Sequence, residues 1–230
     1  MNESGGHGTA LGMAAFEAWL RTADAILCGL NHAFSNRVSA LAVVPLIAGK
    51  AVRDVTGLER LATETGKLED LLRLYRLMER GERAPAEPLQ VADAVAEALA
   101  LLAHHPTARD LTCSVAGVAE TLPVLVVPSA LVHALVLLLC AAADRLDGGA
   151  ASGGLHLRYS GDPDWVTFVV ETHSPVPQGR AVQVPELPVL AWLVRGASVS
   201  GSESRTPEGG VRLELRLATL PNVRKGEGCA

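Results

Sequence analysis

Apolar residues first recur at helical spacing between about residues 13 and 50. At about 100° per residue they share one face, and this stripe consists of Phe16, Ala23, Leu27, Leu30, Phe34 and Leu41. Pro45 lies near the end of the stretch and is expected to kink or break the helix, because proline has no backbone N–H. The pattern therefore predicts one long amphipathic helix.

A second helix is predicted from about residue 54 to residue 80. Its stripe consists of Leu58, Leu61, Leu68, Leu72 and Tyr75, and charges of both signs cover the other faces. Two long antiparallel helices with such narrow stripes bury little apolar surface on their own. Two copies of the hairpin bury both stripes in a four-helix bundle, so we expect a homodimer.

The polar, proline-containing stretch 81–88 separates the hairpin from a region in which element types alternate. Helices are predicted at 89–104, 128–146 and 185–195, and strands at 111–116, 154–160, 165–171, 197–202 and 210–218. The expected fold class is α+β: an N-terminal antiparallel helical hairpin followed by an α/β sandwich with helices on one face of a mixed sheet. The predicted division is a flexible N-terminus at 1–12, the hairpin at 13–84, the sandwich at 85–220 and a disordered tail at 221–230.

Composition and charge exclude several classes of partner. Apolar residues make up 49% of the chain and aromatic residues 3%, so the core is built from Leu, Val and Ala. A formal net charge of -5 leaves no basic excess for nucleic acid or an anionic membrane. The most apolar stretches, 41–48 and 130–143, are shorter than the ~20 residues that span a bilayer.

The four cysteines are far apart and form no CxxC pair, which predicts neither a metal site nor a disulfide framework. The N-terminus has no signal-peptide pattern. We therefore expect a cytoplasmic protein with no membrane segment.

Residues 29–37 read Gly-Leu-Asn-His-Ala-Phe-Ser-Asn-Arg, so that His32 is followed four residues later by Asn36. This resembles the H-box of histidine kinases, where a phospho-accepting histidine precedes Asn or Thr at that spacing. Residues 88–102 resemble the first helix of the kinase ATPase domain, and residues 122–131 resemble the approach to its N-box helix. Residues 187–193 and 209–217 resemble its later helix and closing hairpin. The chain is thus similar to a histidine kinase core over roughly residues 15–220.

The nucleotide motifs of that family are missing. Ala141 stands where the N-box places a metal-binding Asn, and residues 172–177 carry neither the Asp nor the glycines of Asp-x-Gly-x-Gly. The segment that corresponds to the ATP lid, 173–186, is short, and Ala33 replaces the acid that usually follows the histidine. The resemblance therefore implies a degenerate ATPase domain that binds no ATP and holds no Mg²⁺.

His32 lies about 180° round the helix from the apolar stripe. Considered alone it is an ordinary exposed helix histidine, whereas the resemblance makes it the phospho-acceptor, and neutral imidazole is a competent nucleophile near pH 7. Asn36 is then expected to orient a water or an incoming phosphoryl group, with a merely solvated side chain as the alternative. Further candidate contacts for the phosphoryl group or the partner are Arg37, Ser35, Cys28 and Ser39.

Three other histidines have simpler interpretations. His104 and His105 close a helix before Pro106, where cationic side chains suit the helix C-terminus, so capping is favoured over metal binding. His133 lies within an apolar helix and is expected to be a core or boundary residue whose ring finds a hydrogen-bond partner.

The resemblance implies a histidine phosphotransferase similar to the ChpT-like family, which relays a phosphoryl group between response-regulator receiver domains. His32 is the carrier, the chain binds no cofactor, and the partner receiver brings its own Asp and Mg²⁺. Two alternatives stay open: an atypical histidine kinase with a divergent ATP site, and a non-catalytic dimeric scaffold or inhibitor of a signalling kinase. Binding of an ATP analogue would identify the first, and a function that survives substitution of His32 would identify the second.

Overall fold

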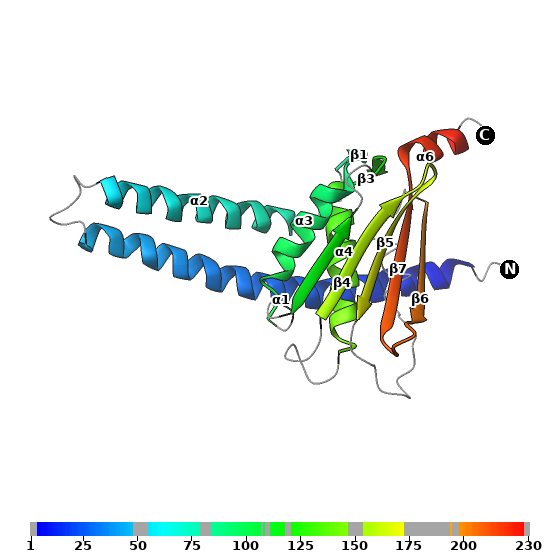
Figure 1. The fold of residues 1–230 in the computed structure, drawn as a ribbon, viewed down its shortest axis with the longest axis horizontal. Coiled ribbons are helices and arrows are strands. Elements are labelled where there is room, and N and C mark those ends of the chain that lie inside the picture. Colours follow the sequence, from blue (N-terminus) through cyan, green and yellow to red (C-terminus); the bar gives the residue numbers. More distant parts are fainter. Residues whose placement is uncertain are drawn as a thin grey trace.

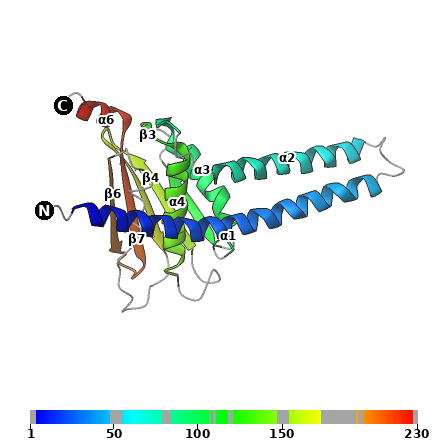
Figure 2. The ribbon, with the colours of Figure 1, turned by 180° about the vertical axis from the view of Figure 1, so that it is seen from behind.

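The computed structural model describes residues 4–47, 55–78, 84–106, 108, 111–117, 121–146, 154–172, 194 and 198–227. The chain begins with two long helices, α1 (Ser4–Ile47) and α2 (Val55–Leu77), which run side by side as a hairpin (Figure 1). The α/β part of the molecule lies against the N-terminal half of α1 (Figure 2). The apolar patterns therefore produced the two helices that they predict.

The ends of the hairpin helices differ from the prediction. α1 begins at Ser4, within the segment 1–12 that the sequence predicts to be flexible, because extending a nucleated helix adds one hydrogen bond per residue. It also continues through Pro45, where we expected a kink or break. Proline lacks one backbone N–H donor, and so close to the end of a helix few hydrogen bonds remain to be disturbed. Residues 48–54 and 79–83 lie outside the described residues, so the domain boundary at residues 84–85 stays a prediction.

The second part of the chain is an α/β sandwich, which confirms the predicted fold class. Five strands form a mixed sheet in the order β2-β4-β5-β7-β6, where β2 and β4 are parallel and the other pairs are antiparallel. The strands are β2 (Thr112–Gly117), β4 (Gly154–Gly161), β5 (Trp165–Thr172), β6 (Val199–Arg205) and β7 (Val211–Ala218). Two helices, α3 (Val91–Leu102) and α4 (Pro128–Ala143), cover one face of this sheet (Figure 1). The helix predicted at 185–195 lies outside the described residues except for Val194.

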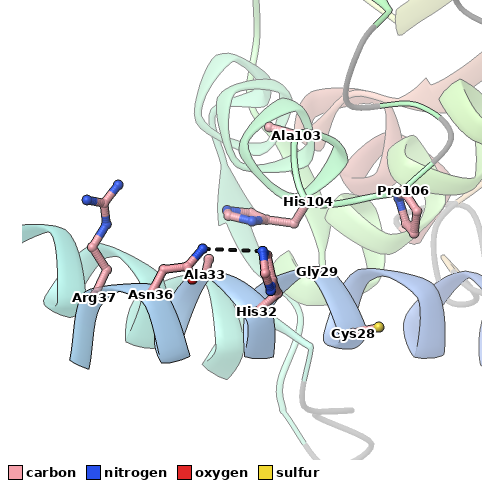
Figure 3. Close-up of a pocket in the computed structure, with 9 residues that line it drawn as sticks. All are labelled: Cys28, Gly29, His32, Ala33, Asn36, Arg37, Ala103, His104 and Pro106. Atoms are coloured by element: carbon pink, nitrogen blue, oxygen red, sulfur yellow. Dashed lines mark hydrogen bonds between the residues drawn. The ribbon is translucent and has the colours of Figure 1, made fainter. Parts of the chain in front are cut away.

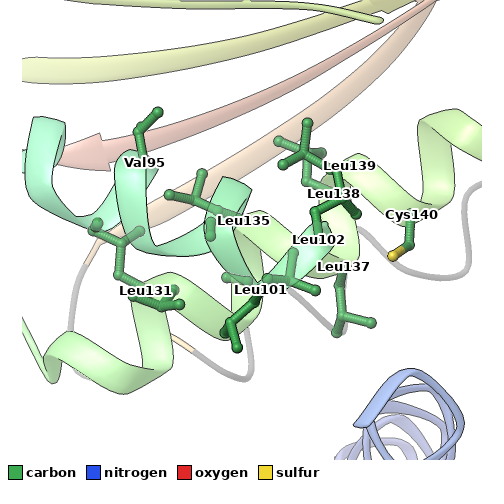
Figure 4. Close-up of a cluster of buried hydrophobic side chains, with 14 of the residues drawn as sticks. Val95, Leu101, Leu102, Leu131, Leu135, Leu137, Leu138, Leu139 and Cys140 are labelled. Carbon is green, nitrogen blue, oxygen red and sulfur yellow. The ribbon is translucent and has the colours of Figure 1, made fainter. Parts of the chain in front are cut away.

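The core lies between the sheet and α4. Alternate residues of β7, from Val211 to Leu217, are buried toward the helices, as expected of a strand with one covered face. α4 is buried at every position from Leu131 to Ala142, because the sheet covers one side and α1 and α3 cover the others (Figure 4). Among the described residues, none of the helices combines the length and the apolar character that a membrane crossing requires.

Two features were not expected from the sequence. β1 (Glu87–Leu89) pairs with β3 (Val124–Val126) in a small antiparallel sheet. The tail, predicted to be disordered from residue 221, forms the helix α6 (Leu220–Glu227). Thr219 starts this helix, since its hydroxyl accepts a hydrogen bond of 3.4 Å from the Asn222 backbone N–H, as N-cap residues do.

Candidate functional site

His32 and Asn36 lie one turn apart on the exposed surface of α1. The Asn36 side-chain amide lies 3.3 Å from His32 Nε2, so the two side chains are hydrogen-bonded (Figure 3). Residues at i and i+4 on a helix are neighbours, which is why this spacing brings the two groups together.

The hydrogen bond has a consequence for the imidazole. An amide nitrogen only donates, so Nε2 must be the acceptor and must carry a lone pair. In the neutral ring the proton is then on Nδ1. With the amide in this orientation, the hydrogen bond favours the tautomer whose Nε2 carries the lone pair.

A pocket of about 460 Å³ opens beside His32. One wall is the surface of α1, which includes Cys28, His32 and Asn36, and the other comes from the end of α3 and the residues after it (Figure 3). That second wall consists of Ala103, His104 and Pro106. α3 ends at Leu102 and the chain turns there, with the His104 N–H bonded to the Leu101 carbonyl. The site thus combines hairpin and sandwich residues.

Gly29 allows the two walls to approach each other. A Cβ at this position would lie 1.9 Å from the His104 carbonyl oxygen, far inside any real contact distance. The backbones of α1 and of the α3 C-terminus are therefore closer than any side chain permits. This contact sets the position of His104 relative to His32.

Arg37 also lines the pocket, but its guanidinium is engaged with the second helix. It donates to Glu64 Oε2 at 3.1 Å, and Lys67 donates to Glu64 Oε1 at 2.7 Å. The hydrogen bond from Lys67, with that from Arg37, holds the pKa of Glu64 below its usual value. Arg37 thus links α1 to α2 through Glu64.

The other predicted contacts divide into two groups. Cys28 lines the pocket, whereas Ser35 and Ser39 do not. The Ser35 hydroxyl donates back to the Asn31 carbonyl at 2.9 Å, an ordinary bond within the helix. The pocket residues that the sequence did not indicate are those after α3, because no local pattern predicts which helix end meets His32.

The sandwich is held on the hairpin by a second contact, around His133 of α4. The His133 ring is 2% exposed, stacks on Trp19 of α1 at 3.8 Å, and its Nε2 lies 2.6 Å from the Leu77 carbonyl at the end of α2. That short distance pairs a ring N–H with a helix-terminal carbonyl. His133 is a core residue whose ring has a partner, as predicted, and it joins three helices.

The α4 surface that carries Ala141 faces α1. Ala141 lines a second pocket of about 220 Å³ together with Cys140 and Asp144 of α4, and Arg21 and Thr22 of α1 form its other side. This volume is below the roughly 300–1,000 Å³ of typical small-molecule sites. Burial raises the pKa of the Cys140 thiol to about 12, so it is an unreactive core thiol. Within the described ranges no group of three or more His, Cys, Asp or Glu side chains is close enough to hold a metal ion.

No protein-family model matches the chain, and a search of curated proteins finds no match either. Solved histidine kinases are similar in structure. The nucleotide-free catalytic domain of ThkA has 11% identity and a TM-score of 0.49, covering 60% of this chain and 98% of that one. AdeS of Acinetobacter baumannii has 13% identity and a TM-score of 0.46, covering 82% of this chain and 98% of that one. ThkA in complex with the response regulator TrrA has 14% identity and a TM-score of 0.46, covering 83% of this chain and 60% of that one. Similarities at this level assign no activity, substrate or partner to the chain.

Proposed function

We propose that this protein is a histidine phosphotransferase, similar to the ChpT-like family. His32 accepts a phosphoryl group from the aspartate of one response-regulator receiver domain and returns it to another. The observation that carries the proposal is the exposed His32–Asn36 pair beside an open pocket. Transfer between two proteins needs an accessible nucleophile, and the exposed His32 supplies one.

The transfer step follows from the tautomer. Nε2 of neutral His32 attacks the phosphorus of the aspartyl phosphate, the bond from phosphorus to the carboxylate oxygen breaks, and its electron pair returns to the carboxylate. The Nδ1 proton stays on the ring, which becomes an imidazolium until water takes that proton. A Mg²⁺ ion held by the receiver would offset the charge of the phosphoryl oxygens, and this chain would contribute mainly positioning. Asn36 must release Nε2 as phosphorus arrives, and its amide can then donate to a phosphoryl oxygen.

The absence of an ATP step is supported by the packing of α4. Ala141 has no metal-binding side chain, and Arg21 and Thr22 of α1 lie across the same surface. A triphosphate needs a cation and a roomy, polar site to offset its charge. An aspartyl phosphate is already a reactive donor, so the proposed reaction needs neither.

The proposed active form is a dimer through the hairpin. On α2, Leu61, Leu68, Leu72 and Tyr75 share a face; Leu61 is 41% and Leu72 43% exposed, whereas the Tyr75 ring also meets Phe34 of α1. Their spacing of three, four and seven residues is that of a helix-bundle seam. Fully burying an exposed leucine is worth roughly 1.5–3 kcal/mol, and Leu61 and Leu72 each have less than half of their area left to bury. A second copy of the hairpin is the occupant that we propose for this stripe.

The decisive experiment incubates the protein with a panel of phosphorylated receivers and counts the acid-labile label. We expect transfer to the wild type, none to His32→Gln, and slower transfer to Asn36→Ala. His156→Gln is the matched control, because His156 lies on the sheet, is hydrogen-bonded to Ser114 and does not line the His32 pocket. If no receiver labels the protein, or if His32→Gln is labelled as well as the wild type, the proposal is wrong.

Calorimetry with Mg-ATP separates this function from that of an atypical kinase. We expect no heat of binding to the full chain, with a histidine kinase of known affinity as the positive control. A micromolar dissociation constant would contradict the ATP-independent mechanism and favour the kinase.

A further inference from the structure

Among the described residues, the titratable side chain that the sandwich contributes to the pocket beside the phospho-acceptor is His104. Figure 3 shows its side chain extending from the end of α3 toward the His32–Asn36 pair. The close approach of Gly29 to the His104 carbonyl holds this part of the chain against α1. His104 thus lines the same pocket as His32 from a second element, with its backbone held against α1.

A phosphoryl group on His32 brings two negative charges into this pocket. Arg37 is the permanently cationic side chain in the pocket lining, and its guanidinium already donates to Glu64. His104 is half-buried, and burial lowers the pKa of its imidazole, which favours the uncharged ring with one N–H. Such a ring donates to a phosphoryl oxygen, and the nearby negative charge then favours its protonation.

We propose that His104 is a second phosphoryl-contacting residue, which donates a hydrogen bond from the sandwich to the phosphoryl group that His32 receives. This inference rests on the proposed function and extends it. The phosphoryl group would lie between two walls, with Asn36 donating from α1 and His104 from the end of α3. The small side chains of Ala33 and Ala103, which also line the pocket, leave room for it.

The neighbouring residue provides a matched control. His105 is also half-buried and its pKa is also lowered by burial, but it lines the pocket between α1 and α4 instead. A His→Leu substitution at 104 or at 105 therefore makes the same chemical change at adjacent positions, and only the first removes a donor from the His32 pocket. His104→Gln keeps an amide donor that does not titrate, and it tests for rescue.

The experiment measures transfer from a phosphorylated receiver to the full-length chain as a function of receiver concentration. For His104→Leu we expect kcat to fall roughly tenfold to a hundredfold, the range for losing a hydrogen bond to a charged group, with KM unchanged. His104→Gln should recover most of the loss, and His105→Leu should match the wild type. Circular dichroism of each variant checks that the fold is retained, and His104→Gln supplies the comparison should His104→Leu not fold.

If His104→Leu and His105→Leu transfer the phosphoryl group at equal rates, the proposed role of His104 is wrong. The proposed role of His32 would be unaffected by that result. A raised KM with unchanged kcat also overturns the proposed role of His104, because His104 would then only dock the receiver. Where His104→Leu does not fold, a His104→Gln rate equal to that of a non-donating His104→Ala overturns it as well. If no receiver labels the wild type, the proposed function itself fails, and that outcome is visible before any variant is compared.

Discussion

Replacing Gly29 with alanine should separate the sandwich from the phospho-acceptor helix. The new Cβ would lie 1.9 Å from the His104 carbonyl oxygen, and contacts below 3.0 Å are not tolerated, so the two backbones must part by about 1.1 Å. Neither wall can relieve this clash by a rotamer change, because the atom in the way belongs to the backbone. Overpacking of this kind typically costs about 1–3 kcal/mol.

Gly66 provides the control for this substitution. It lies inside α2, and a Cβ there meets nothing within 4 Å. Both Gly→Ala changes gain about 1 kcal/mol of helix propensity, so the difference between the two variants isolates the clash. We expect Gly66→Ala to raise the thermal midpoint by roughly 2–4 °C. The thermal midpoint of Gly29→Ala should be lower than that of Gly66→Ala, by an amount that corresponds to about 1–3 kcal/mol of stability.

The same pair should differ in phosphotransfer. Displacing a positioning group by about 1 Å can cost on the order of a hundredfold in rate, so Gly29→Ala should transfer slowly and Gly66→Ala at the wild-type rate. Thermal unfolding and the receiver-labelling assay measure the two effects. If Gly29→Ala is as stabilising as Gly66→Ala and transfers normally, α1 and the end of α3 do not approach as described, and the two-walled site is wrong.

Three other perturbations test the packing and the assembly. Trp19→Ala should lower the free energy of unfolding by about 3–5 kcal/mol in denaturant titration, since the ring is 3% exposed, whereas the same change at the exposed Phe16 should cost far less. The double variant Leu61→Glu, Leu72→Glu should be monomeric by light scattering and keep its helical circular dichroism; a dimer of unchanged mass would contradict the proposed interface. The pKa of Glu64 is lowered in the folded chain, so its contribution to stability is present above the usual carboxyl value of 4.5 and is lost as pH falls through the lower folded value. Glu64→Gln should therefore flatten the acid limb of the midpoint-versus-pH curve, and an unchanged acid limb would show that the carboxylate contributes nothing.

The sequence predicted elements well where local pattern decides them. β5 and β7 alternate buried and partly buried residues, and α4 begins with Pro128 in its first turn, so period and capping chemistry indicated these elements directly. The turn between β6 and β7 carries Gly209 with a φ of 85°, a backbone conformation that favours glycine. The one-turn spacing of His32 and Asn36 likewise fixed their mutual geometry.

The sequence could not predict how the elements dock. The predicted stripe of α1 included Phe16, which is exposed, and omitted Trp19 and Ile26, which are buried against the sandwich. A periodic pattern shows that a face is apolar, but not which of two partners covers it. On α2 the predicted stripe includes Leu61 and Leu72, which are exposed, and omits Leu71, Leu74 and Met78, which lie in the core. The second wall of the His32 pocket depends on the same docking, which is why no motif revealed it.

The docking also bears on the choice between relay and kinase. Thr22 lies beside the α4 surface that carries Ala141, and it precedes His32 by ten residues on the same helix. At a rise of 1.5 Å per residue, that surface is ~15 Å along α1 from the phospho-acceptor, whereas reacting atoms must approach to about 3–3.5 Å. For a nucleotide on that surface to reach His32 within one chain, the sandwich would have to leave α1 and break both the Gly29 contact and the Trp19–His133 stack. A receiver that approaches the open pocket requires no such movement. Within a single chain, the contacts that fix the sandwich are therefore an obstacle to transfer from a nucleotide on that surface to His32, and they leave the pocket beside His32 open to a receiver.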